Sequence, residues 1–365
     1  MRVPAPVFRM PNKARVSIKD IAKAAGVSHS TVSRSLRDSP LIMPDTKARI
    51  QRLAHEMGYI PNAWARSLVI GQTRAVGVVV TTIADPFIAE VVQGIENTAY
   101  EHDYTVILIS SNSDPSREMA AVEMLRSKRV DSVIVTSSRV GALYQGRLER
   151  IGVPVVLINN HSEQSGRYLY SITVDNQHGG YLATRHLIEL GHRRIAYITG
   201  PSNHSSNTGR MVGYHQALTE ANIPFDPALV VLGHGRVESG EQALSGLLEA
   251  AGQATAVFCY NDMTAIGLLR AARRSRLAVP QDLSIVGFDD IPFASYVCPS
   301  LTTLAQPQFE MGQQAMQMAL ELMKNQAPTD GQISDISIKG QLIVRESSGC
   351  PRALAIESTR IPILN

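Results

Sequence analysis

The sequence lacks the features of a membrane-spanning, secreted or disulfide-rich protein. No apolar run approaches the roughly 18 residues that a bilayer crossing requires, and three prolines interrupt the first fourteen residues, where a secretory signal needs a continuous apolar segment. The three cysteines, Cys259, Cys298 and Cys350, are an odd number at spacings that match neither a disulfide framework nor a zinc site. We therefore expect a cytoplasmic protein with reduced thiols and no membrane partner.

Catalytic motifs are also absent from the sequence. It contains no Gly-x-Ser-x-Gly elbow and no Walker loop, its glycines lack the dinucleotide-binding spacing, and its ten histidines form no His-x-x-x-His pair. His192 stands in a basic Gly-His-Arg-Arg turn, where we expect a structural role. We expect neither an enzyme nor a metal or other cofactor.

Charge is distributed unevenly along the 365 residues. Residues 1–74 carry thirteen Lys and Arg against four Asp and Glu, a net charge of +9, whereas the remainder has a net charge of −6. A basic segment of this size is typical of nucleic-acid binding, although a solvated basic tail or an anionic lipid surface would give the same charge. The length, with 44% hydrophobic and 18% charged residues, predicts two or three globular domains.

The basic segment has the pattern of two short helices joined by a turn. Ser17 and Asp20 form a capping box that predicts a helix beginning at Ile18, and Gly26 predicts its end. Ser28 stands where a second helix needs its N-cap. Two short helices joined by a glycine turn are typical of a helix-turn-helix, whose second helix enters the DNA major groove.

The second helix would bury Val32 and Leu36 and expose a polar, basic surface. The residues expected on that surface are His29, Ser30, Ser33, Arg34 and Arg37. A third helix is predicted by apolar residues at helical spacing before Gly58, namely Ile50, Leu53, Ala54 and Met57.

Residues 17–68 resemble the DNA-binding headpiece and hinge of the LacI/GalR family of bacterial repressors. The landmarks at the family's spacing are Ile21-Ala22, Ala25-Gly26-Val27-Ser28, Thr31-Val32-Ser33-Arg34, Gly58-Tyr59 and Pro61-Asn62. The resemblance implies that three residues read bases, namely His29, Ser30 and Arg34. It also implies positions that hold phosphates or cap helices, namely Ser17, Ser28, Thr31 and Ser33.

The chemistry of the side chains agrees for Arg34, because an arginine can donate to O6 and N7 of guanine together. The alternative for Arg34 is a phosphate contact or a solvated charge. For His29 and Ser30 the alternative is positioning without base readout.

The stretch from Asn62 to Leu68 is too short to be a stable helix alone in water, so we expect it to order only when something holds it. By the resemblance this hinge contacts DNA through Asn62, Ala65 and Leu68, and the leucine wedges between base steps of the minor groove. The alternative for Leu68 is ordinary linker packing. Trp64 lies where two hinge helices of a dimer touch in the family.

From Ala75 onward, apolar runs of about six residues alternate with amphipathic stretches of twelve or more, a pattern typical of parallel α/β layers. The runs include 76–80, 104–109, 133–135, 153–158, 195–198, 229–232, 256–259 and 283–287. About nine such units fit two lobes better than one sheet. The resemblance extends over about residues 15–347 and implies a periplasmic-binding-protein-like core, in which a small molecule binds between two lobes.

The predicted fold is therefore an all-α helix-turn-helix headpiece joined by a hinge helix to a two-lobed α/β periplasmic-binding-protein-like core. The expected segments are a basic tail (1–14), a helix-turn-helix domain (15–60), a hinge (61–74), an effector-binding and dimerisation core (75–347) and a C-terminal tail (348–365). Within the core, lobe 1 is expected at about 75–173 and 304–325, and lobe 2 at about 174–303 and 326–347.

Polar residues that follow the strands are the candidates for ligand contact, because the carboxyl ends of parallel strands face the cleft. These candidates are Thr81, Thr136, Asn159, Asn261 and Asp289. They match effector-contacting positions of the family, as do Phe87, which would form an apolar wall, and Arg210, which would supply a cation. Such a set suits the hydroxyls of a sugar. The alternatives are that Asp289 caps its turn and that the threonines satisfy local backbone. A sugar acid or phosphate stays open, since Ser205, Ser206 and Thr208 lie near a helix start.

The main functional hypothesis is a sequence-specific transcriptional regulator, most often a repressor in this family, controlled by a small molecule such as a sugar or sugar derivative. Its expected partners are double-stranded, pseudo-palindromic operator DNA, the effector, and a second copy in a homodimer, with further pairing into a tetramer left open. The alternative is a cytoplasmic sugar-binding or sugar-modifying α/β protein whose basic N-terminus is incidental.

Overall fold

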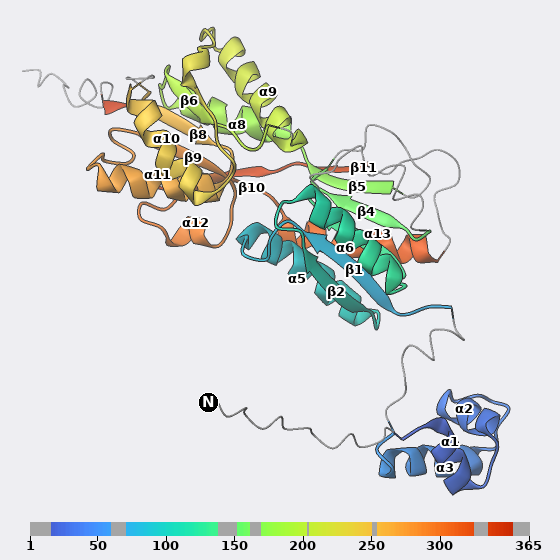
Figure 1. Ribbon diagram of the computed structural model, residues 1–365. Helices are drawn as coiled ribbons and strands as arrows, with labels where there is room; N and C mark the ends of the chain where they lie inside the picture. The colour runs from blue at the N-terminus through green and yellow to red at the C-terminus, as the bar shows by residue number, and fades with distance from the viewer. Residues whose placement is uncertain are drawn as a thin grey trace, which may run out of the picture. The chain divides into compact units, whose positions relative to one another are not determined.

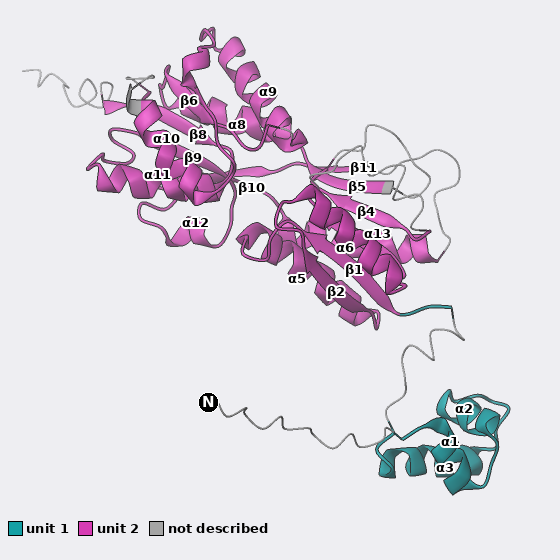
Figure 2. Ribbon diagram, viewed as in Figure 1, with its two compact units in different colours: residues 1–73 teal, residues 74–365 magenta. Residues whose placement is uncertain are grey.

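The computed structural model describes residues 16–59, 71–137, 152–160, 169–202, 204–249, 254–324 and 335–352. The chain divides into two compact units, residues 1–73 and residues 74–365 (Figure 2). Several predictions fall outside the described residues: the basic tail, the hinge residues Asn62, Trp64, Ala65 and Leu68, and most of the C-terminal tail.

The first unit contains the three predicted helices, α1 (Ile18–Ala25), α2 (His29–Leu36) and α3 (Pro44–Glu56). The backbone N–H and the hydroxyl of Ser17 donate to the Asp20 carboxylate at 2.8 and 2.7 Å, which confirms the capping box. Gly26 ends α1 at a φ of +65°, in the left-handed region that suits glycine. Ser28 caps α2 by accepting from the backbone N–H of Thr31 at 3.1 Å.

One residue from each helix is completely buried at the centre of this unit: Ile21, Val32 and Ile50. Burying an aliphatic side chain of this size contributes roughly 1.5–3 kcal/mol, so these contacts fix the orientation of α2. The polar face of α2 is consequently turned to solvent.

The second unit contains two six-stranded sheets (Figure 1). The first sheet has the order β11-β5-β4-β3-β1-β2, and all its strands run parallel. Its strands are β1 (Ala75–Val80), β2 (Thr105–Ser110), β3 (Ser132–Thr136), β4 (Val155–Ile158), β5 (Leu169–Val174) and β11 (Asp335–Ile338). Successive side chains point to opposite faces, so Val78 packs against α5 (Pro86–Glu101) and α13 (Gln308–Met323), while Val79 packs against α6 (Pro115–Ser127).

The second sheet has the order β12-β10-β9-β8-β6-β7, with β12 antiparallel to β10. Its strands are β6 (Ile195–Ile198), β7 (Val230–Val231), β8 (Ala256–Cys259), β9 (Ser284–Asp289), β10 (Thr302–Ala305) and β12 (Gln341–Ile343). Helices α8 (Asn176–Glu189) and α9 (Ser205–Glu220) cover one face, and α10 (Val237–Glu249) and α11 (Asp262–Arg274) cover the other. Two short helices, η2 (Pro227–Leu229) and α12 (Phe293–Tyr296), complete this lobe.

Each of the eight apolar runs overlaps a strand, so this part of the α/β prediction is confirmed. The runs did not predict β5, β10, β11 and β12, which are interrupted by polar residues or are very short. Within the described residues, no helix combines the length and the apolar character that a membrane crossing needs.

The chain passes between the sheets after Val174, after Ala305 and after Ile338. The assignment of residues 326–347 to the second lobe is wrong for β11, because this strand pairs with β5 in the first sheet. The reason is that β11 is a short edge strand whose apolar residues Ile336 and Ile338 alternate with polar ones, so it has no apolar run.

The C-terminal tail also begins later than expected. The hydroxyl of Ser348 lies 2.9 Å from Nε2 of His186, and the carbonyl of Gly349 lies 2.8 Å from Nε2 of His192. Arg352 forms an ion pair with Asp282 at 2.8 Å. Residues 348–352 therefore belong to the second lobe, and buried His192 has the structural role that we expected.

Paired helices approach each other closely at glycines, where a larger side chain would not fit. A Cβ at Gly94 of α5 would collide with the carbonyl of Phe309 in α13, and one at Gly312 of α13 would collide with the carbonyl of Val91. The pair α8 and α9 is built in the same way, because a Cβ at Gly180 would meet the backbone of Arg210. This close approach fixes the position of Arg210 in the site described next.

Candidate functional site

The surface of α2 carries the predicted DNA-reading residues. His29, Ser30 and Arg34 are exposed, and within the described residues the guanidinium of Arg34 makes no hydrogen bond or ion pair. Arg37, one turn later, is engaged with its own helix: its Nη2 donates to Oγ of Ser33 at 2.6 Å and its Nε donates to the Ser33 carbonyl at 3.1 Å. Of these two arginines, Arg34 is the one whose donors are available to a base.

The remaining predicted residues of the headpiece are engaged in local structure. Ser17 and Ser28 cap helices, and the hydroxyl of Ser28 lies 2.9 Å from the hydroxyls of both Ser30 and Thr31. The hydroxyl of Ser33 accepts from Arg37. A hydroxyl whose hydrogen is not used in these bonds, such as that of Ser33, can still donate it to a phosphate oxygen.

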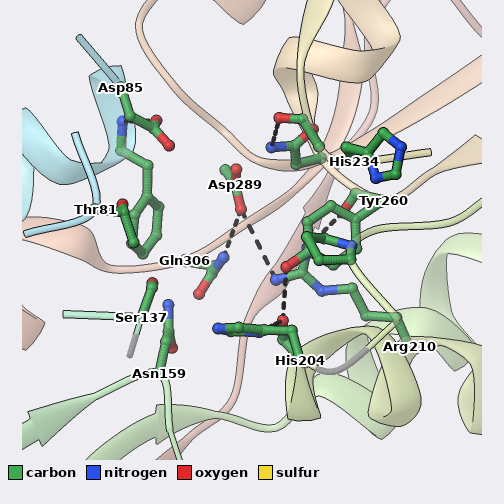
Figure 3. Close-up of a pocket in the computed structure, with 15 residues that line it drawn as sticks. Thr81, Asp85, Ser137, Asn159, His204, Arg210, His234, Tyr260, Asp289 and Gln306 are labelled. Atoms are coloured by element: carbon green, nitrogen blue, oxygen red, sulfur yellow. Dashed lines mark hydrogen bonds and ion pairs between the residues drawn. The ribbon is translucent and has the colours of Figure 1, made fainter. Parts of the chain in front are cut away.

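A cavity lies in the second unit, at the carboxyl ends of strands from both sheets (Figure 3). Thr81 and Asn159 follow β1 and β4 of the first sheet, while Tyr260 follows β8 and Asp289 ends β9 of the second. The arrangement is the one expected for ligand binding at the ends of parallel strands.

Six of the seven residues expected to contact an effector line this cavity: Thr81, Phe87, Asn159, Arg210, Asn261 and Asp289. The exception is Thr136, which is 2% exposed and is not among the lining residues. The next residue, Ser137, lines the cavity in its place, where the backbone turns through a φ of +47°. The expectation for Thr136 was therefore one residue early.

Arg210 is buried at the centre of the second lobe's side of the cavity. Its Nε donates to Oδ1 of Asn176 at 3.0 Å, its Nη1 donates to the carbonyl of Tyr260, and its Nη2 lies 4.0 Å from Oδ1 of Asp289. The guanidinium carbon also lies 3.5 Å from the ring centroid of Phe288 and 4.5 Å from that of Tyr260. Arg210 thus joins several elements of the lobe as well as lining the cavity.

Asp289 occupies an unusual backbone conformation, with a φ of +125°, and is 6% exposed. Burial raises the pKa of its carboxyl well above the usual range, an effect that the Arg210 cation opposes and that Asp262 and Asp85 reinforce. A conformation of this kind costs of order 1–3 kcal/mol and persists where surrounding structure imposes it. Its presence beside a cavity is typical of a binding site.

Asn261 also has a structural role. Its Oδ1 accepts from the backbone N–H and the hydroxyl of Thr264, and its Nδ2 donates to the carbonyl of Gly235 at 3.0 Å. This side chain is therefore the N-cap of α11 as well as part of the cavity wall.

The lining residues that were not predicted from the sequence include Asp85, Ser137, His204, His234, Tyr260 and Gln306, whereas Ser206 had been considered as part of an anion site. Asp85 caps α5 and directly precedes a proline at the first helical position, which is a readable helix start. Tyr260 directly follows the run 256–259, so the rule that identified Asn261 also points to it. Gln306 had no such signal, because the strand before it was not predicted.

One chain of hydrogen bonds crosses the second lobe's wall. Nδ1 of His204 lies 2.5 Å from the hydroxyl of Ser206, which lies 2.7 Å from the hydroxyl of Tyr260 (Figure 3). Over the part of the chain that the structure describes, no cluster of His, Cys, Asp or Glu is suited to hold a metal ion.

Comparisons with known proteins agree with this geometry. Residues 17–62 match the family described as bacterial regulatory proteins, lacI family, and residues 184–348 match the periplasmic binding protein-like domain. The HTH-type transcriptional repressor PurR of Photorhabdus laumondii is 38% identical over 91% of this chain and 96% of its own.

Two solved structures extend the similarity over nearly the whole chain. The Lac repressor dimer bound to operator and the anti-inducer ONPF matches with a TM-score of 0.81 and 27% identity, over 92% of this chain and 100% of that one. The complex of the transcriptional regulator CelR with cellobiose matches with a TM-score of 0.70 and 30% identity, over the same shares, 92% and 100%.

A helix-turn-helix headpiece attached to a two-lobed core with a small-molecule cavity defines a ligand-responsive transcriptional regulator. The chain belongs to the lacI family of bacterial regulatory proteins. It is accordingly a DNA-binding transcriptional repressor controlled by a small molecule, and not an enzyme. Family membership confirms the expectation of a transcriptional repressor controlled by a small molecule, and it rules out the alternative of a sugar-binding or sugar-modifying protein whose basic N-terminus is incidental.

Proposed function

We propose that a sugar or sugar derivative bound in the cavity between the two lobes controls the affinity of this repressor for its operator. The observation that supports this proposal is that six of the residues expected to contact an effector line one cavity, and that they come from both lobes. The wall combines acceptors, donors and hydroxyls with the apolar faces of Phe87 and Tyr260, a combination that suits a hydroxylated ring. The structural neighbour CelR has cellobiose in its complex.

In the same proposal, the headpiece reads one half-site of a pseudo-palindromic operator. His29, Ser30 and Arg34 contact base edges, while Ser17, Ser28, Thr31 and Ser33 position the headpiece on phosphates. Asn62, Ala65 and Leu68 complete the contact from the hinge, with the leucine as the minor-groove wedge. The exposed face of α2 and the free donors of Arg34 support this assignment.

We also propose that the repressor acts in the cytoplasm as a homodimer, because a two-fold symmetric protein matches a two-fold symmetric operator. The resemblance to the Lac repressor dimer supports this oligomeric state. Sedimentation velocity on the full chain distinguishes a dimer from a tetramer.

The test of effector control uses Asp289→Asn, which keeps the size of the side chain and replaces one carboxyl oxygen by an amide NH2 group. Wild-type protein should gain about 2.7 kcal/mol of stability in a sugar at one hundred times its dissociation constant, and the sugar should change operator affinity. Asp289→Asn should lose both responses and keep operator binding in the absence of sugar. If the sugar acts as a co-repressor, the variant should instead fail to bind operator tightly in its presence. A variant that responds like wild type would place the ligand elsewhere.

A deletion variant tests whether ligand binding and operator binding belong to different units. A chain that begins at residue 75 should keep the ligand-induced rise in melting temperature and lose operator affinity, since residues 1–73 form a compact unit of their own. Loss of ligand binding on deletion would contradict the assignment of the effector site to the second unit.

A further inference from the structure

Asp289 is presented to the cavity by a turn whose backbone conformation is unfavourable. Asp289 and the next residue, Asp290, have φ values of +125° and +57°, although neither is a glycine. Such conformations persist only where the surrounding structure imposes them, and they occur most often at functional sites. Figure 3 shows the Asp289 carboxyl directed towards Gln306 and Arg210, with dashed lines marking both interactions. A group outside the turn must therefore hold it.

Asp262 is such a group. Its side chain is completely buried, and its Oδ2 accepts from the backbone N–H of Ile291, directly after the turn, at 2.9 Å. Its Oδ1 accepts from the hydroxyl of Thr303 at 2.5 Å, and the same hydroxyl accepts from the backbone N–H of Asp290 at 3.3 Å. One carboxyl group is thus connected to the turn twice, directly at Ile291 and through Thr303 at Asp290.

The fold makes room for this carboxyl at a position where it carries a cost. Asp262 is the first residue of α11, directly after Asn261, which lines the cavity. A Cβ at Gly287 of β9 would collide with Oδ1 of Asp262, so a glycine is needed opposite it. Burial raises the pKa of Asp262 to about 7, because the charged form is unfavourable in the interior of the lobe. Since an apolar side chain would avoid this cost, the two bonds to the turn explain why a carboxyl is found here.

We propose that Asp262 is a positioning residue of the effector site, whose carboxyl group holds the turn 289–291 so that Asp289 is presented to the ligand. This inference rests on the proposed effector site and adds a residue that does not itself line the cavity. The bonds of Asp262 join α11 to the end of β9 and to β10. The position of the Asp289 carboxyl therefore depends on how these three elements pack together.

Three substitutions remove different parts of the connection. Asp262→Asn can keep both bonds, because an amide oxygen can accept from the Ile291 N–H while the NH2 group donates to the Thr303 hydroxyl. Asp262→Ala removes both bonds. Thr303→Val removes only the hydroxyl that joins Asp262 to the backbone of Asp290. The effect on the turn should therefore be largest for Asp262→Ala, smaller for Thr303→Val and smallest for Asp262→Asn.

Ser284 provides a matched control, because it begins the strand that Asp289 ends. It is completely buried, its hydroxyl donates to the carbonyl of Gly349 at 3.0 Å, and the same hydroxyl accepts from the backbone N–H of Gly349 at 3.0 Å. Ser284→Ala therefore also removes buried hydrogen bonds of β9, at the end of the strand that is remote from the cavity. A general loss of stability should appear in both Ser284→Ala and Asp262→Ala, whereas a loss of positioning should appear only in the second.

The first experiment compares crystal structures of wild type and the four variants without ligand, in one crystal form. In Asp262→Ala the φ values of Asp289 and Asp290 should leave the positive range, and in Asp262→Asn and Ser284→Ala they should stay there. If Asp262→Ala does not fold, Thr303→Val takes its place in this comparison. An unchanged turn in the variant compared, or an equal change in Ser284→Ala, would overturn the proposal.

The second experiment measures binding of a sugar probe, chosen from D-ribose, D-glucose and cellobiose as the one that stabilises wild type most. Calorimetry is run on the full chain at a temperature where circular dichroism shows every variant to be folded. Asp262→Ala should weaken binding about tenfold or more, because binding must then restore the turn, and Thr303→Val should weaken it about threefold. Asp262→Asn and Ser284→Ala should stay within about twofold of wild type.

The outcomes separate this inference from the proposed effector site. Equal losses in Asp262→Ala and Ser284→Ala, or a loss in Asp262→Asn as large as that in Asp262→Ala, would exclude the positioning role. Loss of binding in Asp289→Asn together with wild-type binding in Asp262→Ala would also exclude it and leave the effector site intact. If none of the three sugars binds wild type, the proposed effector class is wrong, and the crystal structures still decide whether Asp262 positions Asp289.

Discussion

Arg34 and Arg37 are both exposed, but of these two only the guanidinium of Arg37 is hydrogen-bonded within the described part of the chain, to Ser33. Replacing each arginine by alanine should therefore affect DNA binding differently. Arg34→Ala removes a guanidinium that makes no bond within the described residues, whereas Arg37→Ala removes one that is bonded twice to Ser33. A bidentate contact to guanine contributes about 1–3 kcal/mol of discrimination, so Arg34→Ala should weaken operator binding roughly 5- to 150-fold. Arg37→Ala should weaken operator and random DNA alike, by about one phosphate contact at most.

The assay is fluorescence anisotropy with an operator obtained by in vitro selection from a random duplex library, and with a random duplex of equal length. Measurements at several KCl concentrations give the salt slope, which should change by less than one for Arg34→Ala. Replacing each half-site guanine in turn by 7-deazaguanine removes the N7 acceptor. At one guanine this change should weaken wild-type binding and have no further effect on Arg34→Ala.

Two results would refute the reasoning. Equal losses on operator and random DNA would show that Arg34 contacts only phosphates. Additive effects of Arg34→Ala and of 7-deazaguanine at every half-site guanine would show that this side chain does not donate to N7.

Three further predictions concern stability. Ser28→Ala removes the N-cap of α2, and hydrogen exchange within this helix should become about fivefold faster, because such a cap contributes about 1 kcal/mol. Gly312→Ala should lower the free energy of unfolding by about 1–3 kcal/mol, because its Cβ would collide with the Val91 carbonyl, whereas Gly246→Ala, with open space around it, should be neutral or stabilising in the same denaturation experiment. Burial raises the pKa of Asp262 from an ordinary value of 3.8 to about 7, so the native state retains a proton that the unfolded chain has released. The free energy of unfolding should therefore fall between about pH 4 and 7, by up to roughly 1.4 kcal/mol per pH unit for this group, and Asp262→Asn should flatten that dependence in urea titrations.

The headpiece was predictable because its signals are local. Ser17 bonds to Asp20 and Ser28 bonds to Thr31, so each cap and its partner lie within three residues of each other in the sequence. The end of α1 depends on the freedom of Gly26 at positive φ, which is a property of that residue alone. Nothing distant in the chain is needed to specify these features.

The cavity was predictable in part, because parallel strands bring their carboxyl ends together whatever the rest of the fold does. The same rule failed for Thr136, where a single residue decides whether a side chain points into the sheet or into the cavity. The search for apolar runs failed for β11, since an edge strand with an alternating pattern resembles a loop as much as a strand. These errors concern register and pairing, which depend on contacts that a linear pattern does not contain.

The hydrogen bonds that the site residues make within the protein could not be predicted from the sequence. Asp289 was expected as a ligand contact or as a turn cap, yet it accepts hydrogen bonds from Gln306 and Gln308, which belong to the segment that leads into the other lobe. Its carboxyl therefore faces the cavity and holds the crossing at the same time. A ligand that changes the charge or the hydrogen bonds of Asp289 must also change the energy of that crossing, because both share the same atoms. Such sharing is a physical basis for control, because binding energy in the cavity acts on one of the three segments that join the two lobes.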